Sequence, residues 1–150
     1  MEIRKIDNID EIESIIRKAT TCRIGLVDND EPYVVPVCFG YERGALYFHG
    51  SLKGRKVDLI KKNGKICFEM EADVEVVKDE EPCDWAIKYR SVIGTGKAHI
   101  LETDEEKSHG LNVIMRQYAK GDFSFPKSKL DSVLVVKVDI SRMSGKQLQD

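Results

Sequence analysis

The residues best suited to bind a charged ligand lie in one short stretch, HGSLKGRK at positions 49–56. It follows an apolar run, contains two glycines and a serine, and precedes a predicted helix. Residues 53–65 contain six lysines or arginines and one acidic residue, Asp58. Free N–H groups at a helix start, a hydroxyl and ammonium groups together suit a phosphate dianion. The alternative is a solvent-exposed basic helix after an ordinary glycine turn, and the residues alone favour neither.

The preceding apolar stretch, residues 33–39, contains a second candidate for ligand binding. It is apolar on both faces, so we expect a strand that is buried on both sides. Pro36 removes one N–H from its middle, which sheets tolerate mainly at edges or interruptions. A strand that stops pairing there would present the backbone of Val37, Cys38 and Phe39 to a flat polar heterocycle. The alternative, an edge strand protected by its proline, is favoured by the residues alone.

Other catalytic motifs are weak or absent from the sequence. The GTGK segment at 94–97 fails as a nucleotide-binding loop, because Ser91 replaces the first glycine and Ala98 the metal-binding hydroxyl. No serine lies in a GxSxG motif, and no CxxC pair provides a local zinc scaffold. We expect reduced cysteines, with Cys38 and Cys67 acting as small core residues.

Short strands position these residues. Apolar periodicity predicts six strands, at residues 22–28, 33–40, 45–49, 65–76, 85–101 and 133–140. Three helices are predicted, at residues 8–20, 54–63 and 103–118. Capping boxes, Asn8 with Glu11 and Thr103 with Glu106, indicate the starts of the first and the third. In the fifth strand the apolar phase changes after Ser91, before Gly94 and Gly96, which indicates a bulge or a close approach to the backbone. Because most strands are joined by short turns, an antiparallel barrel decorated by helices is favoured over a doubly wound parallel sheet.

Length and composition indicate one domain, residues 1–150, with an N-terminal helix within residues 1–20 and a polar tail at 141–150. Apolar residues make up 41% and charged residues 33%, which excludes wholesale disorder. A net charge of −2 gives no general attraction to nucleic acid or anionic membranes. No apolar run approaches the ~20 residues of a membrane span, and the N-terminus lacks a signal-peptide core. We therefore expect a cytoplasmic protein without nucleic-acid or membrane partners.

Three segments together resemble a known family. YVVPVCFGYERGALYFHGSLKGRK (33–56), NGKICFEME (63–71) and YRSVIGTGKA (89–98) are similar to the pyridoxamine 5′-phosphate oxidase-like flavoproteins, and closest to the branch of nitroimidazole-resistance (Nim) proteins. The resemblance implies a mainly β, six-stranded antiparallel split β-barrel with Greek-key connections. It also implies a homodimer that holds FMN at the subunit interface.

The resemblance assigns roles to particular residues. Val37, Cys38 and Phe39, after Pro36, would lie along the flavin ring and ribityl chain. The ribityl phosphate would be held by His49, Gly50, Ser51 and Lys56. Ser91 and Val92 would lie near the flavin at the subunit boundary. His49 is a candidate for orienting a substrate.

The resemblance further implies a flavin-dependent oxidoreductase that reduces a small nitro- or quinone-like acceptor. Three alternatives remain: a non-catalytic flavin carrier or sensor, a pyridoxamine-phosphate-oxidase-type oxidase, and a barrel that binds no flavin. The vitamin B6 oxidases have additional arginines and a C-terminal segment for the substrate phosphate, whereas the segment after Ile140 here is only SRMSGKQLQD, with Arg142 and Lys146. A deazaflavin remains an alternative to FMN. An apolar ladder formed by Trp85, Ile87 and Tyr89 fits a subunit interface or the core equally well.

Overall fold

The computed structural model describes residues 1–149. Its elements are β1 (Glu2–Ile6), α1 (Ile9–Lys18), β2 (Cys22–Asp28), β3 (Glu31–Val37), β4 (Phe39–Glu42), β5 (Ala45–Gly50), α2 (Arg55–Lys62), β6 (Lys65–Val77), the 3-10 turn η1 (Pro82–Asp84), β7 (Ala86–Ile100), α3 (Asp104–Tyr118), α4 (Lys127–Leu130) and β8 (Leu134–Gln149). Two helices begin where capping residues predict. Asn8 accepts the N–H of Glu11 at 3.0 Å, and Thr103 accepts that of Glu106 at 3.1 Å.

One antiparallel sheet contains all the described strands, in the order β3-β2-β6-β7-β8-β5-β4, and β1 pairs with β8 outside this path. The two end strands, β3 and β4, are joined in the chain by a single residue, Cys38. The sheet must therefore curve until its two edges meet at this residue. This β3–β4 junction, residues 37–39, is where the predicted antiparallel barrel remains open.

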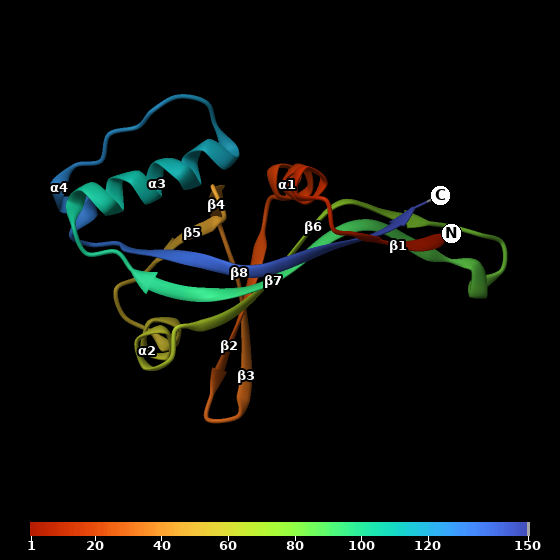
Figure 1. The fold of residues 1–150 in the computed structure, drawn as a ribbon, viewed down its shortest axis with the longest axis horizontal. Coiled ribbons are helices and arrows are strands. Elements are labelled where there is room, and N and C mark those ends of the chain that lie inside the picture. The colour runs from red at the N-terminus through yellow and green to blue at the C-terminus, as the bar shows by residue number, and fades with distance from the viewer. Residues whose placement is uncertain (150) are drawn as a thin grey trace.

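Three long strands, β6, β7 and β8, cross the molecule (Figure 1). Register shifts interrupt their pairing between Ala72 and Glu75 and between Thr95 and Gly96, which lets them bend. Beside the second shift, a Cβ added at Gly94 would overlap the ring of Phe68. The sequence predicted that some group approaches the backbone closely at the glycines of β7. At Gly94 that group is the ring of Phe68, a residue of the protein's own core.

Two apolar clusters lie on the two faces of β5, which explains its uninterrupted apolar sequence. Leu46 and Phe48 belong to the main core, inside the curved sheet. Ala45 and Tyr47 belong to a second cluster beneath α3. Figure 1 shows α3 along β5 and β8, with α1 and α2 beside the long strands. Among residues 1–149, no helix is long and apolar enough to cross a membrane.

The structure corrects the sequence analysis at both ends of the chain. The N-terminal helix begins only at Ile9, because residues 2–6 form β1. The predicted polar tail, 141–150, is strand up to Gln149, where β8 pairs with β7 and β1; Asp150 lies outside the described residues. The backbone N–H and C=O groups of this segment form hydrogen bonds with two neighbouring strands. The segment can therefore be a strand with few apolar side chains. Residues 1–149 form eight strands rather than the six predicted, because β1 is added and the strand at 33–40 divides at Cys38.

Burial corrects further expectations. β3 is an edge strand with alternate exposed residues, Val34 among them at 64% exposure, rather than a strand buried on both faces. Cys38 and Cys67 are exposed, whereas Cys22 is buried. Burial raises the pKa of the Cys22 thiol to about 12, so this thiol stays protonated at neutral pH.

Candidate functional site

The predicted phosphate-binding segment forms a turn between the end of β5 and the start of α2. A Cβ added at Gly50 would lie 3.4 Å from Nζ of Lys56, so the ammonium group rests on this glycine. Lys56 is half-buried, and no carboxylate among residues 1–149 forms an ion pair with it. Burial, and then the Lys56 charge, lower the pKa of His49. The turn therefore presents an unneutralised ammonium beside an imidazole that is held neutral.

Two other cations of the basic segment have protein partners. Arg55 lies 3.3 Å from both Asp28 and Glu31 and stacks on Tyr33, 4.3 Å from the ring centroid. Lys62 donates to the side chain of Asn29 at 2.9 Å. These side chains fix α2 to the β2–β3 turn, so part of the basic helix is structural.

The start of α2 offers donors as well as charge. Gly54, its N-cap, has a φ of 144°, a value that favours glycine, and no side chain within residues 1–149 caps the helix. The first N–H groups of α2 thus lack a side-chain acceptor. Ser51 and Lys53 precede them as exposed residues. Donors, a hydroxyl and the Lys56 ammonium are all suitable partners for one phosphate.

The β3–β4 junction lies beside this turn. Phe39 pairs with Phe48, the residue before His49. Phe39 and Val37 have buried side chains, so only their backbone and the exposed Cys38 can meet a ligand. The N–H of Phe39 donates to the hydroxyl of Tyr118 at 3.0 Å. Tyr118 ends the helix that the sequence predicts at residues 103–118, and nothing in its spacing indicated this contact.

Ser91 and Val92 lie elsewhere in the chain. Val92 is fully buried and pairs with Gly145 of β8, whereas His49 pairs with Val135 of the same strand. Ten residues of β8 separate these partners, or roughly 33 Å at about 3.3 Å per residue along the strand. One chain therefore does not bring Ser91 and Val92 to the turn at residues 49–56. Ser91 instead lines a separate cavity of about 370 Å³ between β1, β7 and β8.

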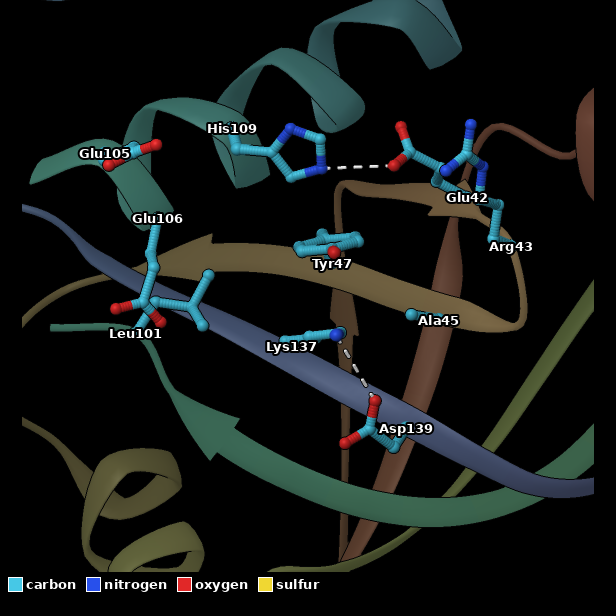
Figure 2. A pocket seen from close by; sticks show the side chains of 10 residues that line it. All are labelled: Glu42, Arg43, Ala45, Tyr47, Leu101, Glu105, Glu106, His109, Lys137 and Asp139. Carbon is cyan, nitrogen blue, oxygen red and sulfur yellow. Dashed lines mark hydrogen bonds and ion pairs between the residues drawn. The ribbon is translucent and has the colours of Figure 1, made fainter. Parts of the chain in front are cut away.

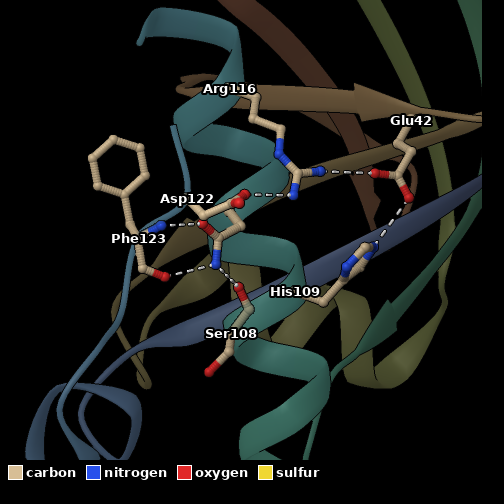
Figure 3. A network of polar contacts seen from close by, with 7 residues as sticks. Glu42, Ser108, His109, Arg116, Asp122 and Phe123 are labelled. Atoms are coloured by element: carbon tan, nitrogen blue, oxygen red, sulfur yellow. Dashed lines mark hydrogen bonds and ion pairs between the residues drawn. The ribbon is translucent and has the colours of Figure 1, made fainter. Parts of the chain in front are cut away.

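A cavity of about 520 Å³ that the sequence did not indicate opens between α3 and the outer face of β5 and β8 (Figure 2). His109 contacts Tyr47 edge to face, with ring centroids 5.9 Å apart, and lies 3.1 Å from Glu42. Glu42 also pairs with Arg116, which extends the network to Asp122 (Figure 3). Because these charges pair with one another, we interpret them as groups that attach α3 to the β4–β5 hairpin. None of the sequence-predicted site residues lines this cavity.

Residues 1–149 contain no group of side chains that could together hold a metal ion.

Comparisons with known proteins identify relatives of the whole chain. Residues 8–147 match the family model described as pyridoxamine 5′-phosphate oxidase. A Bacteroides thetaiotaomicron structure, provisionally assigned to 5-nitroimidazole antibiotic resistance, is 34% identical with a TM-score of 0.85, over 98% of this chain and 89% of that one. A FAD and heme binding protein from Mycobacterium smegmatis is 17% identical with a TM-score of 0.86, over 97% and 74%. A FAD-binding protein from Mesorhizobium loti is 17% identical with a TM-score of 0.72, over 99% and 100%. A comparison with curated proteins found no match.

Proposed function

The chain belongs to the pyridoxamine 5′-phosphate oxidase family and has its split-barrel fold, and from this premise we propose that it binds FMN. The observation that carries the proposal is Lys56, a half-buried ammonium without a carboxylate partner among residues 1–149, placed against the backbone of Gly50. An unneutralised charge beside free helix N–H groups suits a ribityl phosphate. Ser51 supplies a hydroxyl to the same site.

The flavin ring would lie along the β3–β4 junction. The sheet edge opens here, at Cys38, so backbone groups are available to the polar edge of a flat heterocycle. The junction is next to the proposed phosphate site because Phe39 pairs with the residue before His49. The FAD-binding relatives make FAD the main competitor. We favour FMN because the proposed site provides for one terminal phosphate.

A second subunit would complete the site. Ser91 and Val92 cannot reach the turn of their own chain, so any contact with the flavin would come from a second copy. The β6–β7 hairpin and β1 expose apolar side chains that suit such an interface. These are Ile3 at 60% exposure, Val74 at 55%, Val76 at 54%, Ile93 at 52%, and Trp85 and Ile87 at 51% each. We propose a homodimer with one flavin in each of two shared clefts.

The proposed activity is the reduction of a small nitro- or quinone-like electrophile. Bound flavin supplies hydride or electron transfer, and the protein supplies position and electrostatics. His49 remains neutral at physiological pH because its pKa is lowered, so it can orient an electronegative group of the substrate without a fixed charge. The assignment of antibiotic resistance to the Bacteroides relative supports the nitro group as the first acceptor to test.

Purification and steady-state assays test the proposal. The protein should take up one FMN per chain, and released cofactor should coelute with FMN rather than FAD. With NAD(P)H it should reduce a nitroimidazole or a quinone. Flavin uptake without turnover would indicate a carrier. A colourless protein that binds neither FMN nor FAD would refute the proposal.

A further inference from the structure

The hydroxyl of Tyr118, the last residue of α3, joins three segments that are distant in the sequence. It accepts the N–H of Phe39 at 3.0 Å and donates to the carbonyl of Thr20 at 2.9 Å. Phe39 begins β4, and Thr20 lies between α1 and β2. One side chain therefore connects the end of α3 to the β3–β4 junction and to the segment before β2.

The pairing of the β4–β5 hairpin explains why Phe39 needs this partner. Glu42 and Ala45 flank a two-residue turn and form the first hydrogen-bonded pair, so every second pair along the hairpin lacks hydrogen bonds. Phe39 and Phe48 fall on such a pair, and the N–H of Phe39 points away from β5. Its acceptor is the Tyr118 hydroxyl.

Other contacts fix the end of α3 over the junction. A Cβ added at Gly40 would overlap the carbonyl of Val113, so α3 and β4 pack backbone against backbone. The side-chain amide of Gln117 donates to the carbonyls of Ile16 at 2.8 Å and Ala19 at 2.9 Å, at the end of α1. Because its helix is held from two sides, the Tyr118 hydroxyl has little freedom to move.

From this geometry we infer that Tyr118 is a positioning residue for the flavin ring. By holding the N–H of Phe39, it fixes the backbone of Val37 and Cys38, which the proposed function places along the ring. The inference rests on that proposed function. It extends the site to a side chain that touches neither the phosphate turn nor the ring.

The Y118F variant tests this role, because it removes the hydroxyl and leaves the ring. The N–H of Phe39 then loses its acceptor, and the junction shifts or frays. Affinity for riboflavin and for FMN should fall by about tenfold, or about 1.4 kcal/mol. The visible spectrum of the bound flavin should change as well. In the apoprotein, the amide proton of Phe39 should exchange faster by NMR.

A matched control is Y41F, since the Tyr41 hydroxyl accepts the N–H of Gly44 at 3.3 Å in the β4–β5 turn. It removes the same kind of hydrogen bond from the same hairpin, outside the junction, and should leave riboflavin affinity within about twofold. Unchanged riboflavin affinity in Y118F, or an equal loss in Y41F, would overturn the inference. If Y118F does not fold, fluorotyrosine at position 118 keeps the hydroxyl as a weaker acceptor. It should then weaken riboflavin binding in the same direction, and unchanged affinity would overturn the inference. Wild-type protein that binds no flavin would overturn the proposed function first, and the role of Tyr118 with it.

Discussion

Replacing Lys56 by alanine tests the proposed phosphate site most directly. The variant removes an ammonium group that rests on Gly50 and has no carboxylate partner among residues 1–149. Loss of one charge-assisted hydrogen bond to a phosphate costs about 1.5–3 kcal/mol. FMN affinity should therefore fall roughly 10- to 150-fold, since each 1.4 kcal/mol is a factor of ten. Because Lys56 makes no ion pair with any group in residues 1–149, the variant should fold normally.

Fluorescence titration with two flavins separates the phosphate from the ring. Riboflavin lacks the phosphate, so wild-type protein and K56A should bind it almost equally. The matched control is K61A, which removes the same charge from the exposed last turn of α2, and it should leave FMN affinity nearly unchanged. If K56A loses riboflavin as strongly as FMN, Lys56 supports the fold and our assignment is wrong.

Three further predictions concern assembly and stability. If the cleft is shared between subunits, FMN at one hundred times its dissociation constant should stabilise the dimer by about 2.7 kcal/mol per site; sedimentation of a monomer with full FMN affinity would contradict this. Gly94→Ala places a methyl group on the Phe68 ring, and chemical denaturation should show a loss of about 1–3 kcal/mol; wild-type stability would show that the core absorbs the methyl group freely. Burial and the neighbouring Glu71 raise the pKa of Glu69 from 4.5 to about 7, so the folded state favours the protonated carboxyl. The resulting contribution to the free energy of unfolding is fully present below pH 4.5 and is lost as pH rises through 7. The free energy of unfolding of E69Q should therefore vary less than that of the wild type between pH 4.5 and 8, and an unchanged pH dependence would argue against this shift.

Local signals in the sequence predicted several features of the fold and the site. Asn8 and Thr103 indicated helix starts because each side chain caps a nearby N–H. The glycines and cations of residues 49–56 indicated the turn against which Lys56 packs. Pro36 indicated an edge strand, and the structure places β3 at the edge of the sheet.

Features that depend on distant partners could not be predicted in the same way. Residues 141–149 read as a polar tail because their pairing with β7 and β1 leaves no apolar pattern. The position of Tyr118 at the β3–β4 junction depends on how α3 crosses the sheet, which no spacing encodes. Val74 and Val76 alternate with charged residues in the strand predicted at 65–76, a pattern typical of a buried face, yet both are exposed past the register shift after Ala72. A single displaced residue changes which side of a strand is buried.

The pairing of β1 with β8 has a consequence for protein synthesis. Ile3 pairs with Leu148, and Ile6 with Gly145, so within residues 1–149 the first strand pairs only with the last. A nascent chain would carry β1 unpaired on the ribosome while nearly all of the barrel is translated. Closing so long a loop is entropically costly, and contacts of this sequence separation slow folding. We expect the barrel to complete its folding only after β8 has left the exit tunnel. Until then, exposed strand edges are available to chaperones.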